Sequence, residues 1–141
     1  YGKYGNKHKE EIKVIIKKAI EYKEFGVHIY EPLPRKELFK RIQKSRIFLY
    51  GSSINETFCM AAAESQMLSI PGVVKNYGCI DERILHNKTG FVCSDDKEFC
   101  EGTIKLLQND KIWLSFHKNL VKDRNHFNWL DIAKKWEKII E

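Results

Sequence analysis

The chain has 141 residues, of which 43% are hydrophobic and 31% are charged, and its formal net charge is +6. This length and balance fit a single soluble α/β domain with its own core. The apolar runs are too short to span a bilayer, and we see no signal peptide at the start. We therefore expect a cytoplasmic protein, with peripheral contact to an anionic membrane as an option.

The positive charge favours anionic partners, which include nucleotide diphosphates, acidic membrane surfaces and nucleic acids. The lysines are scattered along predicted helices, so a solvated surface explains them equally well. The aromatic residues occupy apolar helical positions rather than places between exposed lysines, and Trp113, Phe116, Trp129 and Trp136 are interpreted as core. Nucleic acid is therefore not expected as a partner, and a basic nucleic-acid-binding domain is only the last-ranked alternative function.

Four cysteines are present, and they form no C-x-x-C pair and have no histidine at zinc-binding spacing. Buried, reduced thiols are the expected state in a cytosolic protein. The sequence thus predicts neither disulfides nor a metal site. The cysteines are Cys59, Cys79, Cys93 and Cys100.

Apolar residues recur with helical spacing over residues 7–25, and Gly26 is placed to end that helix. A short strand over residues 27–30 and an amphipathic helix over residues 35–44 are predicted next. The continuous apolar run at residues 47–50 is typical of a strand that is buried on both faces.

A polar loop at residues 51–55 leads into a predicted helix over residues 57–69. The later predicted elements are a strand at 73–74, a short helix at 80–86, a strand at 91–93, and helices at 97–107, 111–121 and 129–140. Asp95 and Asp96 are interpreted as a helix-start signal. This alternation predicts a Rossmann-like, doubly wound parallel sheet with helices on both faces. Ligands of such sheets bind beyond the carboxyl ends of the strands, so we expect the site at the loop before Glu56.

The helix start after this loop offers unpaired N–H groups, from residues 57–60, that could hold a phosphate. Glu64 shares a helical face with apolar residues, and the two hydroxyls of a ribose would satisfy a carboxylate there. Glu56 and Glu64 would be about 12 Å apart if the helical rise applied throughout. An extended ligand could then place its sugar near Glu56 and its ribose near Glu64.

Purely structural roles can also account for the presence of Glu56 and Glu64 at these positions. Ser53 and Glu56 have the spacing of a capping box, in which Glu56 only satisfies a backbone N–H group. Glu64 could pair with a lysine or arginine, or lie exposed at a helix edge. Judged from their spacing alone, the two glutamates fit these structural roles better than a ligand site.

The whole run over residues 55–66, NETFCMAAAESQ, carries more information than the two glutamates. Together with residues 70–74, it resembles the E-x7-E motif of retaining GT-B glycosyltransferases of group 1, the family 4-like kind. Further segments resemble that family in the same order along nearly the whole chain. They are residues 32–38, 78–84, 87–92 and 127–129, with Trp136 in the closing helix.

The resemblance implies that Glu56 contacts the transferred sugar as the catalytic residue and that Glu64 binds the ribose. It implies that donor binding also uses Asn55, Thr57, Leu33 and the amides of Phe58, Cys59 and Met60, with backbone at 31–33 contacting the base. The implied reaction is transfer of a sugar from a nucleotide-sugar donor to a glycan or lipid-linked acceptor, with retention at the anomeric carbon. Neither a cofactor nor a bound metal is implied.

Two parts of the family pattern are missing from this sequence. The family has an N-terminal Rossmann-like domain that provides the acceptor site, and an Arg and a Lys that neutralise the diphosphate. We interpret residues 1–141 as a single sugar-nucleotide-binding domain that lacks its first strand–helix unit and the acceptor domain. The Arg and the Lys would then lie before residue 1; the alternative is that Lys3 or Lys7 is one of these two cations. We expect this chain alone to be inactive and to bind donor weakly. A noncatalytic nucleotide-sugar-binding module is the alternative function.

Overall fold

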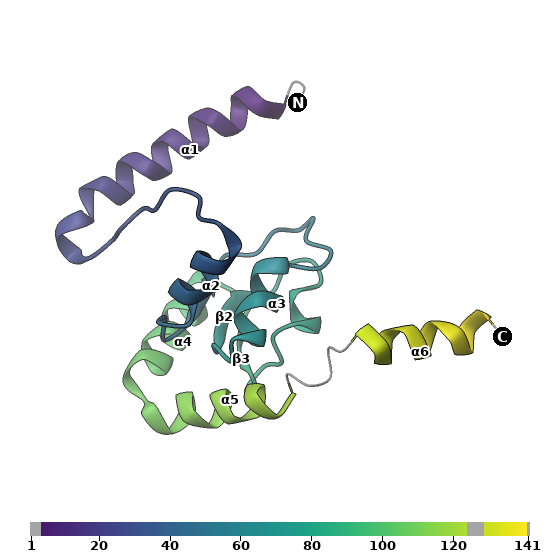
Figure 1. Ribbon diagram of the computed structural model, residues 1–141. Helices are drawn as coiled ribbons and strands as arrows, with labels where there is room; N and C mark the ends of the chain where they lie inside the picture. Colours follow the sequence, from purple (N-terminus) through teal and green to yellow (C-terminus); the bar gives the residue numbers. More distant parts are fainter. Residues whose placement is uncertain (1–3, 124–128, 141) are drawn as a thin grey trace. The chain divides into compact units, whose positions relative to one another are not determined.

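The computed structural model describes residues 4–123 and 129–140 (Figure 1). The chain divides into two units, Tyr1–Leu38 and Phe39–Glu141. The first unit contains helix α1 (Tyr4–Glu21) and the 3-10 turn η1 (Lys23–Phe25). Gly26 ends this turn with a φ of 86°, a left-handed conformation that favours glycine. The α-helix itself ends at Glu21 and not at residue 25 as predicted.

The strand predicted at residues 27–30 is wrong, because residues 27–34 have no regular secondary structure. A strand needs a partner for its backbone hydrogen bonds, and the described part of the first unit is otherwise helical. Helix α2 (Arg35–Ile42) begins where predicted but ends two residues early. The N–H groups of Lys44 and Ser45 turn to carbonyls three residues back, which closes the helix.

The second unit is built on a three-stranded parallel sheet of β1 (Phe48–Tyr50), β2 (Gly72–Lys75) and β3 (Gly90–Cys93), in that order. Leu49 pairs with Val73, and Val73 pairs with Phe91. The predicted parallel sheet is confirmed. β1 is not buried on both faces as expected, because the Leu49 side chain is 48% exposed.

Each face of the sheet packs against a separate group of helices, as a doubly wound fold requires (Figure 1). Helix α3 (Met60–Met67) contacts β1 and β2, and its Ala62 joins Val74 and Ile80 in one core cluster. Helix α4 (Asp96–Gln108) contacts β2 and β3 and is followed by α5 (Asp110–Asp123). The other cluster contains Val73, Phe91, Cys93, Leu106 and Phe116.

The ends of two elements show how local hydrogen bonds set helix boundaries. Asp95 caps α4, since its Oδ1 accepts a 2.8 Å bond from the N–H of Glu98, and this confirms the predicted start signal. The helix predicted at residues 80–86 is only one 3-10 turn, η2 (Ile80–Glu82). The N–H of Leu85 donates to the Thr89 hydroxyl at 2.9 Å instead of continuing a helix.

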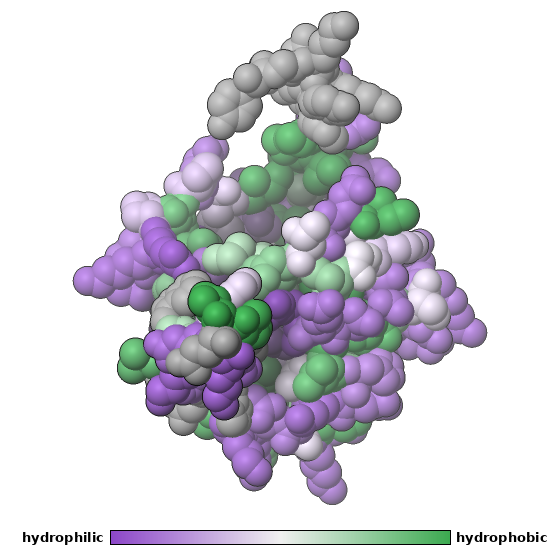
Figure 2. Space-filling model, turned by 90° about the vertical axis from the view of Figure 1, so that its right-hand side faces the viewer, coloured by the Kyte–Doolittle hydropathy of each residue, from purple (hydrophilic) through white to green (hydrophobic). Residues whose placement is uncertain are grey.

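The surface shown in Figure 2 is mostly hydrophilic and is interrupted by groups of hydrophobic side chains. Helix α6 (Trp129–Ile140) has the predicted bounds. Trp136 was expected to be a core residue, but its side chain is 60% exposed, so that prediction is wrong. The side chain of Trp129 and residues 127–128 lie outside what is described, as do Lys3 and the side chain of Lys7. Among the described helices, none is long and apolar enough to cross a membrane.

Candidate functional site

Two loops meet at the carboxyl edge of the sheet, where the sequence predicted a site. The loop after β1 covers residues 51–59, and the loop after β2 covers residues 76–79. The N–H of Cys79 donates to the backbone oxygen of Glu56 at 3.1 Å. Gly78 has a φ of +63°, and a Cβ there would lie 2.5 Å from the backbone oxygen of Glu56. The absence of a side chain at Gly78 therefore permits the close approach, and the hydrogen bond from Cys79 holds the second loop against the backbone of Glu56.

The carboxylate of Glu56 is held at both oxygens. Its Oε2 accepts a 2.8 Å hydrogen bond from the hydroxyl of Tyr50. Its Oε1 accepts a 2.8 Å bond from the N–H of Cys59 and a longer one, at 3.4 Å, from the N–H of Phe58. The partly buried side chain is therefore fixed in direction at the end of the sheet.

These hydrogen bonds separate the pKa values of the two side chains. The bond from Tyr50, followed by that from the Cys59 amide, holds the pKa of Glu56 below its ordinary value. The bond to Glu56, with desolvation by burial, raises the pKa of Tyr50 to about 12. Glu56 is thus a carboxylate, and Tyr50 a hydroxyl donor, throughout the neutral range.

Helix α3 begins at Met60 and not at residue 57 as predicted. Cys59 lies just before it with a left-handed φ of 55°, so the helical backbone cannot extend further back. The capping box with Ser53 is wrong, because the Glu56 carboxylate binds N–H groups that follow it in the chain. The carboxylate does satisfy backbone N–H groups just before α3, as the structural alternative for Glu56 expected. The helical rise from which the 12 Å separation of the glutamates was derived does not apply over residues 56–59.

Glu64 lies on α3 and is partly exposed. The face around it was expected to be apolar and enclosed, but Met60 is 57% exposed and Met67 is 45% exposed. The buried residues of α3 are Ala62, Ser65 and Gln66. Burial thus gives no argument for a ribose at Glu64, and that role remains a prediction of the resemblance.

The other predicted donor-binding residues fall into two groups. Asn55, Thr57 and Phe58 are exposed in the loop before α3, next to Glu56. Leu33 belongs to the first unit, and its predicted place beside the base stays a prediction. The amides of Phe58 and Cys59, which were predicted to bind sugar and diphosphate, donate to Glu56.

Arg83 contacts the site although no sequence motif assigned it a role there. Its guanidinium carbon lies 4.0 Å from the centre of the Phe58 ring, a cation–π contact across 25 positions of sequence. Its Nε is buried and has no hydrogen-bond partner among the described residues. No periodicity or motif in the sequence indicates this contact, since it depends on how η2 packs beside α3.

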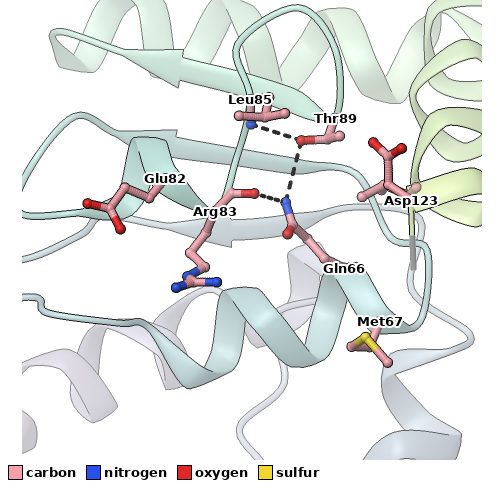
Figure 3. Close-up of a pocket in the computed structure, with 8 residues that line it drawn as sticks. Gln66, Met67, Glu82, Arg83, Leu85, Thr89 and Asp123 are labelled. Atoms are coloured by element: carbon pink, nitrogen blue, oxygen red, sulfur yellow. Dashed lines mark hydrogen bonds between the residues drawn. The ribbon is translucent and has the colours of Figure 1, made fainter. Parts of the chain in front are cut away.

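A small cavity of about 90 Å³ lies where α3 ends, toward the amino ends of the strands (Figure 3). The Gln66 amide points across it and donates to the Arg83 carbonyl and, at 3.4 Å, to the Thr89 hydroxyl. Gln66 and Thr89 are both buried and neutral. Their hydrogen bonds serve the fold, so we do not assign this cavity to the ligand site.

No group of histidine, cysteine, aspartate or glutamate side chains that could hold a metal ion occurs within the described residues. All four cysteines are free, and burial raises the pKa of Cys59 and Cys93. The expectation that the thiols are buried holds for Cys59 and Cys93 only, because Cys79 is partly exposed and Cys100 is exposed. Cys100 lies on the solvent side of α4, whose buried residues are Gly102 and Leu106.

The family model described as glycosyl transferases group 1 matches residues 4–126 of this chain. A search of curated proteins found no match. The matched segment covers most of the chain and contains both loops of the carboxyl edge together with Glu56 and Glu64. The chain therefore belongs to the group 1 glycosyltransferases.

Proposed function

We propose that this chain binds the nucleotide-sugar donor of a retaining glycosyltransferase, which transfers the sugar to a glycan or lipid-linked acceptor. Membership of the family supports sugar transfer. The observation that supports donor binding is the Glu56 carboxylate, fixed by hydrogen bonds at the carboxyl edge of a parallel sheet. Ligands of doubly wound sheets bind at this edge.

In this proposal the Glu56 carboxylate accepts a hydrogen bond from a hydroxyl of the donor sugar. A carboxylate has about four lone-pair positions, and three protein donors leave one for a sugar hydroxyl. A hydrogen bond from a hydroxyl to a charged acceptor is stronger than one between neutral groups. Glu56 would thus hold the sugar close to the bond that is broken, and Asn55 and Thr57 would border it.

The diphosphate requires donors other than the amides that Glu56 already occupies. The first N–H groups of α3 point out of its amino end. The first of them that donates to a preceding carbonyl is the N–H of Ala63, which bonds to the Cys59 carbonyl. The N–H of Ala62 is engaged by the Cys59 thiol, so the N–H groups of Met60 and Ala61 remain for phosphate, assisted by the helix dipole. The ribose would follow toward Glu64 on the same helix.

Calorimetry of the chain with UDP, GDP and ADP, and with their glucose derivatives, tests donor binding. We expect one nucleotide series to bind and Glu64→Ala to abolish its binding. Glu101→Ala is the matched control, because Glu101 is an exposed glutamate on α4, on the opposite face of the sheet. Unchanged affinity in Glu64→Ala would remove the ribose assignment, and no binding by any nucleotide would contradict the proposed function.

A further inference from the structure

Tyr50 is the last residue of β1, and its ring is anchored in the fold. The ring stacks on that of Phe48 with centroids 6.0 Å apart. It also packs against a buried cluster that contains Cys59, Val74 and Ile80. Because β1 is paired along its length with β2, the hydroxyl of Tyr50 has a defined position beyond the sheet edge.

That hydroxyl makes the hydrogen bond that fixes Oε2 of Glu56, at 2.8 Å. The N–H groups of Phe58 and Cys59 fix only the other oxygen, Oε1. Without Tyr50, the side chain could pivot at the amide-held oxygen and turn Oε2 away. The direction in which Glu56 presents its remaining lone pair is therefore set from β1.

We propose that Tyr50 is a positioning residue, whose hydroxyl orients the Glu56 carboxylate toward a hydroxyl of the donor sugar. The inference rests on the proposed function and adds to it a residue outside the E-x7-E run. Tyr50 lies six positions before Glu56 and acts through it without contacting the sugar.

The neighbouring charges and titratable groups support this arrangement. The pKa of Tyr50 is raised to about 12, so the residue stays a donor wherever Glu56 is charged. The Cys59 thiol beside Glu56 has a pKa raised first by burial, and it is neutral at pH 7. Cys79 lies in the loop bonded to the Glu56 backbone, and Arg83 lies over the Phe58 ring.

The first experiment is a carbon-detected NMR titration of the Glu56 carboxyl in the whole chain and in Tyr50→Phe. This variant keeps the ring and removes only the hydroxyl. We expect the pKa of Glu56 to rise toward its ordinary value in Tyr50→Phe. The matched control is Tyr77→Phe, since Tyr77 lies in the neighbouring loop and is 45% exposed, and this variant should leave that pKa unchanged. An unchanged Glu56 pKa in Tyr50→Phe would overturn the inference.

The reciprocal measurement does not depend on any change at Tyr50. In Glu56→Gln, the Tyr50 phenol should titrate well below the value of about 12 that it has in the native chain, nearer the usual 10.0. If Tyr50 still titrates at about 12 in this variant, Glu56 is not its partner, and the inference fails.

The donor measurement uses the nucleotide sugar that binds the native chain. Loss of a hydrogen bond that orients a charged acceptor should weaken binding by about tenfold in Tyr50→Phe. Since the ionised carboxylate accepts a stronger hydrogen bond than the protonated acid, donor binding should also weaken at a higher pH in this variant than in the native chain. A shifted Glu56 pKa with unchanged donor affinity would overturn the positioning role alone. Absence of binding by the native chain would contradict the proposed function, and the inference with it.

Discussion

The two edges of the central sheet use hydrogen bonds in opposite ways. At the carboxyl edge, a charged carboxylate is held by Tyr50 and by two amides of a loop. At the amino edge, the neutral side chains of Gln66 and Thr89 join the end of α3 to the segment before β3. The first group is partly exposed, whereas both members of the second are buried.

Left-handed backbone occurs at both edges and does not distinguish them. Ser52, Cys59 and Gly78 adopt it in the carboxyl-edge loops, and Ser69 and Asn87 adopt it before β2 and β3 at the amino edge. The amino edge also brings two glycines, Gly72 and Gly90, into register in β2 and β3. The edges therefore differ in charge, burial and strand packing, which indicates that the amino edge stabilises the fold and that the carboxyl edge presents an acceptor.

Substitution of Gly90 by alanine tests the amino edge most severely. A Cβ there would overlap the backbone oxygen of Gly72 and lie 2.7 Å from Cγ2 of Ile84, so the two strands must separate. We expect Gly90→Ala to lower the free energy of unfolding by about 3 kcal/mol or more, measured by denaturant titration. Gly51→Ala is the control at the other edge, since a Cβ there meets nothing within 4 Å. Equal losses in the two variants would contradict the comparison.

Gln66→Leu should have a smaller effect on stability and none on donor binding. The change keeps the side-chain volume similar but leaves the Arg83 carbonyl without the amide donor it has now. A buried acceptor without a partner costs about 2 kcal/mol, to be measured in the same unfolding titration. Met67→Leu is the control on the exposed side of α3. A loss of donor affinity in Gln66→Leu beyond that of the control would show that the two edges are not independent.

The sequence predicted the fold where the determining pattern is local. The apolar runs located β1, β2 and β3 to within one residue, and Asp95 was recognised as the α4 cap from its type and place. The strand at residues 27–30 was wrong because pairing depends on a partner that apolar content does not reveal. The start of α3 was wrong because a carboxylate and a left-handed Cys59 determine it.

The candidate site was likewise predicted only in part. Glu56 was located by its motif and by the rule that ligands bind beyond the carboxyl ends of strands. Tyr50 and Arg83 were not located. Tyr50 lies in a strand that was interpreted as apolar core, and Arg83 contacts Phe58 from a separate turn. Both contacts arise only when the elements pack, so no spacing in the sequence encodes them.

The smallest predicted effect is on the pH dependence of stability, in which the carboxyl edge should respond to acid and the amino edge should not. Glu56 has a pKa below its ordinary 4.5, so the folded state binds its proton less readily than the unfolded state does. The stability that Glu56 contributes is therefore complete above the unfolded-state pKa and is lost as the pH falls through the folded-state value.

Unfolding titrations between pH 7 and pH 3 should consequently show a shallower loss of stability in Glu56→Gln than in the native chain. Part of the slope will remain, because the bonds from Ser94 hold the pKa of Glu98 below its ordinary value as well. Gln66→Leu should shift the whole curve downward without changing its slope, because the amide does not titrate. If Glu56→Gln keeps the native slope, the carboxylate is not held as described, and the two edges do not differ in charge-dependent stability.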